Sequence, residues 1–480
     1  MKIKLGQGKL NMSDVARYCG GELYDYTGSL GCEFEYVCTD SREADANTLF
    51  FATRGERVDG HDYIISALDA GCRCVLCEYV PVNISGRDVA FVTVENSVDA
   101  FATLAKGYRE ENPLASVAIT GSVGKTTTKE LTASIMKRFL NLYYTAGNFN
   151  SVIGMPMSLM EAESDRNAAV FEMGMSGFGE IRSMTLTARP RVAMVTNIGS
   201  SHLEYLGTRE NIARAKLEIA EGLREGGYLL LNGDEPLLRR VRPVKNTSFK
   251  TLYVGLDCTN KCDVNATNVR VDDLGTTFDL DFCGKVYSDI RIKLIGRHFA
   301  YNASFAASAA FLLGADESSV REGLADYTPS GMRQNIYKSG DITVIADCYN
   351  AAPESMKGAI DTLASLNVSG KRIAVLGDMR ELGADSDLMH RELGRYVVTR
   401  GIDVLLTLGE SGALIASSAI ESGMSPSSVF AELDADNTER IRAEIVGRLS
   451  PKDAVLFKAS RALRLEKIMD SVFARSETER

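Results

Sequence analysis

The sequence predicts an α/β protein built from three domains. A chain of 480 residues is too long for one ordinary hydrophobic core and corresponds to about three domains of typical size. Apolar strand-like runs alternate with helical segments through most of it, as is typical of parallel sheets covered by helices. A loop with two glycines, Thr120–Thr127, joins one such run to a helix. We expect domains at 1–112, 113–327 and 328–480.

The composition excludes several classes of protein. Hydrophobic residues at 45% and charged residues at 25% are near the globular average, which argues against extensive disorder. A net charge of -10 argues against binding a nucleic-acid backbone, which requires clustered Lys and Arg. The N-terminus lacks an apolar signal segment, and no run of 18 apolar residues occurs. We expect a cytoplasmic monomer that binds neither nucleic acid nor membrane.

The N-terminal domain is expected to mix short strands with one helix and to end at the break Glu110–Pro113. It contains the close cysteines Cys72, Cys74 and Cys77. One interpretation is a metal site. The one we favour is a short strand that buries small hydrophobic thiols, with Cys72 and Cys74 on the same face.

The central domain is predicted to be a largely parallel sheet. Helically spaced apolar residues after the glycine loop indicate a helix through Leu131 and Phe139. Residues 269–295 alternate like an antiparallel ribbon. The strands expected before that ribbon are Ser116–Ile119, Ala169–Phe171, Val192–Thr196 and Tyr228–Leu231.

The C-terminal domain is predicted to be a second, doubly wound sheet of Rossmann-like type, because strands and helices alternate again. Helices are expected from Pro353 and through His390. The expected strands are Ile342–Ala346, Arg372–Leu376, Val404–Leu408 and Val455–Phe457.

The glycine loop has the chemistry of a phosphate-binding loop. Gly121 and Gly124 leave backbone N–H groups free to surround an anion, and the following helix adds its dipole. Lys125 would neutralise phosphate oxygens, and Thr126 would offer a hydroxyl to magnesium. A bare glycine turn is the alternative, and the spacing is two residues shorter than the common pattern. The flanking strand and helix favour the phosphate loop.

Lys216 is predicted to face the core. In the helix expected over 208–223, Ile212, Ile219 and Leu223 share one stripe, and Lys216 projects close to it. Two interpretations are open: the side chain extends along the apolar surface to water, or it is a desolvated amine with a lowered pKa that acts as a nucleophile.

Glu172 and His202 each follow a predicted strand. Carboxylates at strand ends near a phosphate loop are suited to magnesium, so Glu172 is a candidate ligand. His202 is one of only four histidines and should lie at the same edge of the sheet. A structural role for it is equally open.

Together these features resemble the Mur ligases, ATP-dependent enzymes that join amino acids to a UDP-linked peptidoglycan precursor. The short loop Thr120–Thr127 looks like that family's own phosphate loop, and the likeness covers essentially the whole chain. Specific stretches resemble the branch that adds D-alanyl-D-alanine to UDP-N-acetylmuramoyl-tripeptide. They are Gly147–Pro156, Glu172–Met175, Gly179–Ile181, Thr196–His202, Gly331–Arg333, Asp347–Met356 and Leu376–Gly383.

The resemblance implies a ligase that forms an acyl phosphate from ATP, with magnesium and a carbamylated Lys216. The implied catalytic residues are Lys125, Glu172, His202 and Lys216, and the implied metal ligands are Thr126, Glu172, His202 and Lys216. The implied ATP contacts are Thr120, Gly121, Ser122, Val123, Gly124, Lys125, Thr126, Thr127, Asn302, Arg333, Asp347 and Asn350. The implied UDP-substrate contacts are Ser41, Arg42, Arg54, Gly55, Asp59, Gly60, His61, Asn148 and Asn150.

One departure and two rival functions remain. Ala352 stands before Pro353 where relatives commonly have Asn, which removes any contact from that side chain. A Mur-type or folylpolyglutamate-type ligase for another amino acid shares the loop and Lys216, although the N-terminal UDP-like run disfavours folate. A non-ligating P-loop NTPase used as a switch has no need of an inward Lys216.

Overall fold

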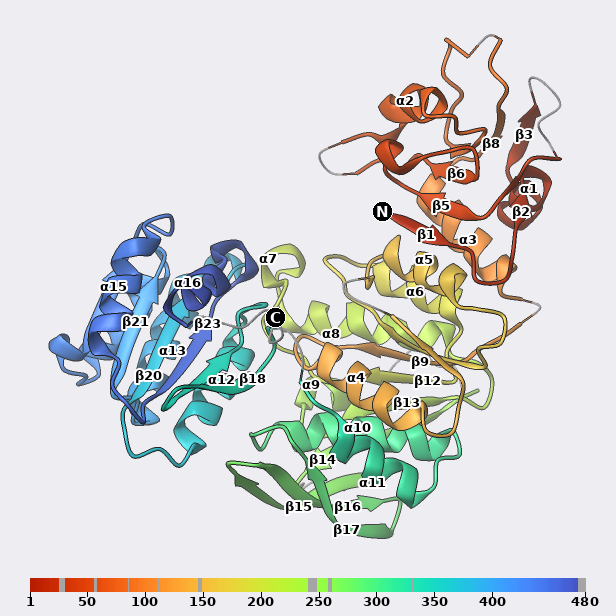
Figure 1. Ribbon diagram of the computed structural model, residues 1–480. Helices are drawn as coiled ribbons and strands as arrows, with labels where there is room; N and C mark the ends of the chain where they lie inside the picture. The colour runs from red at the N-terminus through yellow and green to blue at the C-terminus, as the bar shows by residue number, and fades with distance from the viewer. Residues whose placement is uncertain are drawn as a thin grey trace.

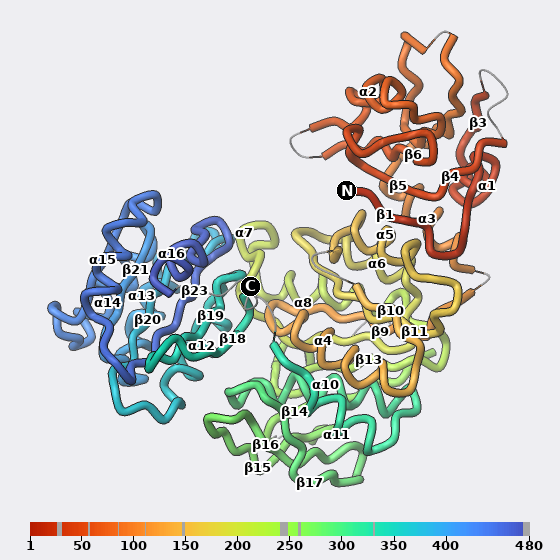
Figure 2. The backbone as a smooth tube through the Cα atoms, viewed as in Figure 1, coloured from red at the N-terminus to blue at the C-terminus, as the bar shows by residue number. Residues whose placement is uncertain are grey.

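The computed structural model describes residues 1–25, 31–55, 58–84, 86–110, 112–145, 149–240, 248–257, 261–329 and 332–473. Three large sheets follow one another along the chain (Figure 1). The N-terminal and C-terminal parts both adjoin the central part, on different sides of it (Figure 2). An α/β fold is therefore confirmed, whereas the boundaries at 112/113 and 327/328 stay predictions.

The N-terminal sheet has the order β1-β5-β6-β7-β8-β3, with a small β2-β4 pair beside it. Its strands are β1 Lys2–Lys4, β2 Leu10–Asn11, β3 Glu22–Asp25, β4 Glu33–Phe34, β5 Tyr36–Cys38, β6 Thr48–Phe51, β7 Cys74–Cys77 and β8 Ala90–Thr93. Three α-helices accompany them: α1 Met12–Cys19, α2 Ile64–Asp69 and α3 Ser97–Tyr108. The expectation of one helix was wrong, because α1 and α2 have only 8 and 6 residues and too few turns to show a periodicity.

The three close cysteines are buried, but not on one face. Cys72 packs with Cys77 in one apolar cluster, while Cys74 belongs to the cluster on the other side of the sheet. The predicted shared face of Cys72 and Cys74 was wrong because β7 begins at Cys74, so strand alternation does not extend back to Cys72. Within the described residues, no group of three or more His, Cys, Asp or Glu is placed to hold a metal.

The central sheet has nine strands in the order β10-β11-β9-β12-β13-β14-β15-β16-β17. Pairing is parallel from β10 to β15 and antiparallel from β15 to β17, which confirms the predicted parallel sheet and ribbon. The strands are β9 Ala115–Thr120, β10 Leu142–Tyr144, β11 Ala168–Glu172, β12 Val192–Val195, β13 Tyr228–Asn232, β14 Lys250–Leu256, β15 Val264–Asp272, β16 Gly275–Phe282 and β17 Lys285–Ile292.

Helices cover both faces of this sheet. One apolar cluster joins it to α4 Lys125–Met136, α10 Phe299–Leu312 and α11 Glu317–Asp326. A second joins it to α5 Gly154–Glu161, α6 Glu180–Ala188, α7 Leu203–Leu206, α8 Arg209–Leu217 and α9 Pro236–Arg240, and continues into α3 and the N-terminal sheet. The N-terminal part therefore shares a continuous core with the central part.

The helix carrying Lys216 is shorter than predicted. α8 ends at Leu217, and residues Glu218–Gly222 form a 3-10 helix. The expectation of one helix to 223 was therefore wrong, although Ile212, Ile219 and Leu223 are all buried as the stripe predicted. Thr208 caps the start of α8, where its Oγ1 accepts a hydrogen bond of 3.2 Å from Asn211 N.

Thr208→Ala is expected to destabilise the protein by about 1 kcal/mol, because α8 loses the acceptor for one of its free N–H groups. Thermal unfolding should show a fall in Tm of about 2 to 4 °C. Thr208→Ser is the matched control, since it keeps the hydroxyl and should retain the wild-type Tm to within about 1 °C. Equal Tm values for wild type and Thr208→Ala would contradict the capping role.

The C-terminal sheet has the order β18-β19-β23-β20-β21-β22, with only the β18 edge antiparallel. This confirms the doubly wound prediction. Its strands are β18 Asn335–Ser339, β19 Ile342–Ala346, β20 Arg372–Gly377, β21 Val404–Leu408, β22 Val429–Glu432 and β23 Ala454–Lys458. Its helices are α12 Pro353–Ser365, α13 Ser386–Thr399, α14 Gly412–Glu421, α15 Thr438–Arg448 and α16 Leu465–Val472. No described helix of the chain is long and apolar enough to cross a membrane.

Candidate functional site

The phosphate loop, Thr120–Thr127, lies at the carboxyl edge of the central sheet. β9 ends at Thr120, and α4 begins at Lys125. Gly121 and Gly124 have φ values of 150° and 82°, which glycine adopts readily. A Cβ on Gly121 would lie 2.0 Å from Thr196 Oγ1, so the loop also needs glycine for close packing.

The loop that follows β12 holds the phosphate loop in place. Val123 N donates to Asn197 Oδ1 over 2.9 Å, and Ser122 N donates to Asn197 O over 3.2 Å. Gly199 N donates to Ser122 Oγ over 2.9 Å. The conformation of the phosphate loop therefore depends on residues 197–199.

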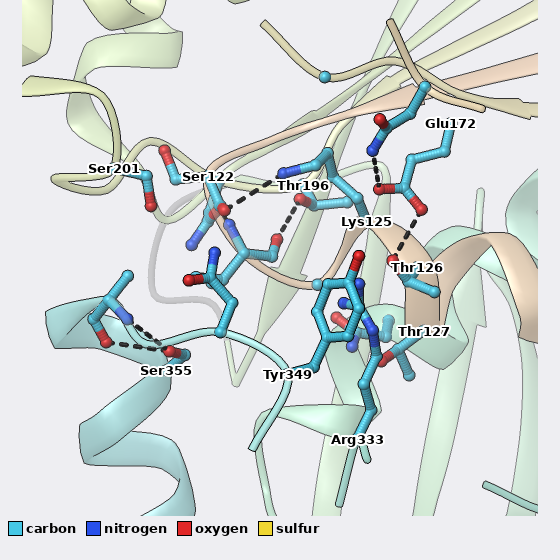
Figure 3. A pocket seen from close by; sticks show the side chains of 18 of the residues that line it. Ser122, Lys125, Thr126, Thr127, Glu172, Thr196, Ser201, Arg333, Tyr349 and Ser355 are labelled. Carbon is cyan, nitrogen blue, oxygen red and sulfur yellow. Dashed lines mark hydrogen bonds between the residues drawn. The ribbon is translucent and has the colours of Figure 1, made fainter. Parts of the chain in front are cut away.

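Lys125 points back into the phosphate loop (Figure 3). Its Nζ donates to Gly121 O over 2.8 Å, which places the ammonium where the loop would surround an anion. Burial lowers the pKa of Lys125, while the nearby Glu172 carboxylate opposes that shift. An anionic ligand would stabilise the ammonium further.

Glu172 ends β11 beside the phosphate loop, and its side chain is 4% exposed. Thr126 Oγ1 donates to its Oε2 over 2.7 Å, and Asn150 Nδ2 donates to its Oε1 over 3.0 Å. Burial alone would raise the pKa of Glu172. The charge of Lys125 and the Thr126 hydrogen bond outweigh burial and hold the pKa below its ordinary value. Glu172 is therefore a buried carboxylate.

The pair formed by Thr126 and Glu172 suits a hard cation. A hydroxyl oxygen and a carboxylate oxygen converge at the mouth of a phosphate loop, and magnesium is commonly bound by one or two carboxylates together with substrate phosphates.

His202 directly precedes α7, at its N-cap position, in a left-handed conformation with φ of 67°. Its Nδ1 lies 2.7 Å from Glu381 Oε2 of the C-terminal part, and contact with His202 lowers the pKa of Glu381. His202 lines the same pocket as Glu172 and Lys125. A carboxylate on Nδ1 would leave Nε2 available to a ligand, as is common for metal-binding histidines.

Lys216 is buried, with 1% of the residue exposed. Burial lowers the pKa of Lys216 well below its usual value, and the charge of Lys125 adds to this shift. No hydrogen bond or ion pair joins its ammonium to a residue of the described chain. The interpretation in which this side chain extends to water is therefore wrong.

The C-terminal part completes the site from the opposite side. β19 and β23 are parallel neighbours, so Asp347 and Lys458 meet at one sheet edge, with Lys458 Nζ 2.7 Å from Asp347 Oδ2. The Arg333 guanidinium lies 3.9 Å from the centroid of the Tyr349 ring (Figure 3). Lys458 Nζ also donates to Asn350 O over 2.9 Å.

These residues share one pocket of about 610 Å³ between the central and C-terminal parts. Asn302 belongs to it and lies against the phosphate loop, since a Cβ on Gly124 would be 3.0 Å from Asn302 Oδ1. Of the predicted residues, the pocket is lined by Ser122, Val123, Gly124, Lys125, Thr126, Thr127, Asn150, Glu172, His202, Asn302, Arg333, Asp347 and Asn350. Thr120, which ends β9, Gly121, which follows it, and Lys216 do not line the pocket.

Among the residues that the sequence did not predict as site residues, Tyr349, Lys458 and His298 line the pocket, and Glu381 contacts it through His202. Lys458 directly follows the predicted strand Val455–Phe457, as Glu172 follows Ala169–Phe171, so the same rule would also have found it. His298 lines the pocket, and burial lowers its pKa to about 4. Ala352, which stands where relatives commonly have Asn, directly precedes α12, and its backbone N donates to Ser355 Oγ over 3.0 Å.

Apart from Asn148 and Asn150, the predicted UDP-substrate residues lie on the N-terminal part, separate from this pocket. His61 is buried, with Nδ1 2.6 Å from Asp59 Oδ1 and Nε2 accepting from Glu78 N over 2.9 Å. Both ring nitrogens of His61 therefore have protein partners, so its role is to hold Asp59 and the backbone at Glu78 in position and not to contact a ligand directly. Arg54 Nε lies 3.0 Å from Glu78 Oε2, and the Arg54 side chain remains 61% exposed.

The other members of this group are mostly at the surface. Arg42 is exposed and pairs with Asp40 through a contact of 2.6 Å. Ser41 is buried at the start of a 3-10 turn. Gly60 leaves no room for a side chain, because a Cβ would lie 2.8 Å from Thr53 O, and a Cβ on Gly55 would lie 3.2 Å from Val58 O. Asn148 lies outside the described residues.

Comparison with known families and proteins agrees with this arrangement. Residues 33–109 match the model "Mur ligase family, catalytic domain", 119–310 match "Mur ligase middle domain", and 332–461 match "Mur ligase, glutamate ligase domain". A UDP-N-acetylmuramoyl-tripeptide--D-alanyl-D-alanine ligase of Bacillus subtilis is 36% identical, over 90% of this chain and 92% of the relative. The enzyme of the same name from Escherichia coli is 34% identical, over 96% and 97%.

Solved structures give the same result. A crystal structure of MurF from Acinetobacter baumannii superposes with a TM-score of 0.87 at 28% identity, covering 98% of this chain and all of that one (100%). MurF ligase from Thermotoga maritima in complex with ADP has a TM-score of 0.79 at 29% identity, covering 91% and 96%. By fold, by the residues of its site and by sequence over nearly its whole length, the chain belongs to the Mur ligase family.

Proposed function

We propose that this protein is an ATP-dependent ligase that joins D-alanyl-D-alanine to UDP-N-acetylmuramoyl-tripeptide in peptidoglycan precursor synthesis. The observation that carries the proposal is the two-sided pocket. A phosphate loop with Lys125 and Glu172 faces Arg333, Asp347 and Lys458 of the C-terminal part. The relatives that are similar in sequence over nearly the full length of the chain are ligases by name.

The chemistry begins with transfer of the γ-phosphate of ATP to the terminal carboxylate of the tripeptide. Both reactants are anions, so the main need is to neutralise charge where it accumulates. Lys125 lies inside the phosphate loop, and Arg333 approaches the same pocket from the C-terminal part. The products are ADP and an acyl phosphate. The dipeptide amine then attacks the acyl carbon, an amide bond forms, and phosphate leaves.

The C-terminal part has a second task, which is to exclude water. An acyl phosphate is hydrolysed if water reaches it, and closure of one domain on another is a common means of protection. Asp347, Asn350 and Asn302 border the pocket where the nucleotide would lie. We assign Asn302 to the adenine side and Asp347 to the ribose side of that nucleotide.

Magnesium fits the residues beside the phosphate loop. Thr126 and Glu172 would hold it, with His202 as a further ligand oriented by Glu381. When bound, magnesium supplies positive charge between the phosphate oxygens. Asn150 would keep Glu172 oriented through its hydrogen bond to Oε1.

We further propose that Lys216 is carbamylated. Its buried amine has no partner in the described chain, and the lowered pKa keeps more of it unprotonated and able to react with carbon dioxide. A bond forms between Nζ and the carbon of carbon dioxide, and one proton is released. The product is a carboxylate-like anion, which would balance the charge of Lys125 and offer oxygen to magnesium.

The N-terminal part is proposed to hold the UDP end of the substrate, with Arg54 as its cation. Arg54→Ala should raise the KM for the UDP-linked tripeptide about tenfold, since one charge-assisted contact is lost, and leave kcat within about twofold. Initial rates at varied substrate concentration measure both. Arg87→Ala, on the same domain and paired with Asp69, is the control and should behave as wild type. A fall in kcat without a change in KM would contradict the assignment.

Substrate omission tests the function as a whole. Phosphate release from ATP should require both UDP-N-acetylmuramoyl-tripeptide and D-alanyl-D-alanine, and mass spectrometry should find a UDP-linked pentapeptide. Release with ATP alone, unaffected by either substrate, would instead indicate an NTPase switch. Turnover with glutamate or diaminopimelate in place of the dipeptide would indicate another ligase of the family.

A further inference from the structure

Glu354 makes a contact between the C-terminal and central parts that the proposed chemistry does not use. It lies in the first turn of α12, and its side chain reaches the loop between β12 and α7. Glu354 Oε1 accepts two hydrogen bonds from Ser200, from the backbone N over 3.1 Å and from Oγ over 3.2 Å. Two donors on one carboxylate oxygen make this a specific contact.

The contact requires glycine at position 199. A Cβ on Gly199 would lie 2.7 Å from the Glu354 carboxyl carbon, so any larger residue would displace the carboxylate. Glu354 Oε2 is buried and has no hydrogen-bond partner among the described residues. Leaving a buried carboxylate oxygen unpaired is costly, so packing alone does not explain this arrangement.

The loop that Glu354 holds is the one that supports the phosphate loop. Gly199 N, one residue before Ser200, donates to Ser122 Oγ over 2.9 Å. His202 follows Ser200 by two residues and lines the pocket. A shift of Ser200 would therefore disturb both the phosphate loop and His202.

Other polar contacts between the two parts lie beside the antiparallel ribbon or at the α7 end of this loop. Thr362 Oγ1 donates to Ile295 O over 2.9 Å, and Asn367 N donates to Asp273 Oδ1 over 2.9 Å, both beside the antiparallel ribbon. Glu381 contacts the far end of the Ser200 loop, where its Oε2 lies 2.7 Å from His202 Nδ1 and its backbone O accepts from Glu204 N over 3.2 Å. Glu354 of the C-terminal part thus contacts the end of the loop that is bonded to Ser122, through Ser200 and its neighbour Gly199.

We propose that Glu354 is a positioning residue that couples closure of the C-terminal domain to the conformation of the phosphate loop. By holding Ser200, it keeps Gly199 against Ser122 and His202 in the pocket when the two domains are together. It does not itself line the pocket, so the effect passes through the loop. The kcat measurements that test this inference rest on the proposed function. The measurement of domain closure by scattering does not, because it depends only on the contact between Glu354 and Ser200.

Glu354→Ala should lower kcat about tenfold, equivalent to about 1.4 kcal/mol. The KM for ATP should stay within about twofold, because Glu354 does not line the pocket and the substitution removes none of the residues proposed to contact the nucleotide. Glu354→Gln keeps an acceptor for Ser200 and should restore kcat to within about threefold of wild type. Glu392→Ala removes an exposed glutamate of α13 in the same domain and is the matched control.

Gly199→Ala tests the same contact from the other side. The added Cβ should displace Glu354 and lower kcat by a similar factor in the wild-type background. In the Glu354→Ala background the Cβ has room, so the same substitution should have little further effect. This non-additivity is the signature of direct coupling.

Small-angle X-ray scattering provides a readout that does not depend on activity. With a non-hydrolysable ATP analogue and the UDP-linked tripeptide, wild type should become more compact than Glu354→Ala. Identical scattering and kcat for these two proteins, or an equal effect of Gly199→Ala in both backgrounds, would overturn the inference. If Glu354→Ala does not fold, the other two variants decide. An inactive Glu354→Gln, or a Gly199→Ala with wild-type kcat, would then overturn the inference. An inactive wild type would defeat the proposed function, while the scattering comparison would still test the coupling.

Discussion

Lys125→Met should lower kcat about a thousandfold, the largest effect of any substitution considered, because a positioned charge is lost where phosphate charge accumulates. The Lys125 ammonium lies within the phosphate loop, 2.8 Å from Gly121 O, and methionine keeps the volume but not the charge. Single-turnover measurement of ADP formation in the presence of all substrates would isolate this step from product release.

Two controls make the Lys125 result specific. Lys137→Met removes an exposed lysine at the end of α4 and should leave kcat unchanged. Lys125→Arg keeps the charge but places it on a larger planar group, so only partial activity is expected. If Lys125→Met retained more than about a tenth of wild-type kcat, charge neutralisation by this residue would not be the main contribution.

Lys216→Ala should lower kcat about a hundredfold, as is typical when a group that orients a metal is lost. The physical reason is the proposed carbamate, which only a neutral buried amine forms. The protein should therefore show a carbamate carbon signal by NMR in ¹³C-labelled bicarbonate, and that signal should be absent from Lys216→Ala.

Lys216→Arg distinguishes a role for the carbamate from a role for a positive charge at this position. The guanidinium is protonated at all relevant pH values and forms no carbamate, so this variant should be as inactive as Lys216→Ala. The sign of the pH dependence follows from the lowered pKa of Lys216. Protonation at low pH removes the reactive amine, so the carbamate signal should decline as the pH falls. An active Lys216→Arg would contradict the carbamate role.

The parts of the site that the sequence predicted are those set by local rules. A strand that ends in glycines before a helix gives the phosphate loop, and the carboxyl ends of parallel strands lie at one edge, which brings Glu172 and His202 to the same pocket. The inward direction of Lys216 followed from its place near an apolar stripe, whereas its burial was one of two open interpretations and is shown by the structure. Each of these inferences uses residues close together in the chain.

The features that the sequence did not predict depend on contacts between distant segments. Glu354 and Glu381 meet the Ser200 loop only because the C-terminal part folds against the central part, and no local pattern specifies that docking. The separate faces of Cys72 and Cys74 depend on where β7 begins. The change of α8 to a 3-10 helix after Leu217 likewise has no signature in its apolar spacing.

The transfer of phosphate to the substrate carboxylate is the central claim, and oxygen labelling tests it most directly. UDP-N-acetylmuramoyl-tripeptide labelled with ¹⁸O in its terminal carboxylate would be turned over with ATP and D-alanyl-D-alanine, and the phosphate released would be examined by mass spectrometry. An acyl phosphate breaks at the bond between carbon and oxygen, so each phosphate should carry one ¹⁸O atom from the substrate. Phosphate free of ¹⁸O, formed at the same rate as the pentapeptide, would contradict the mechanism.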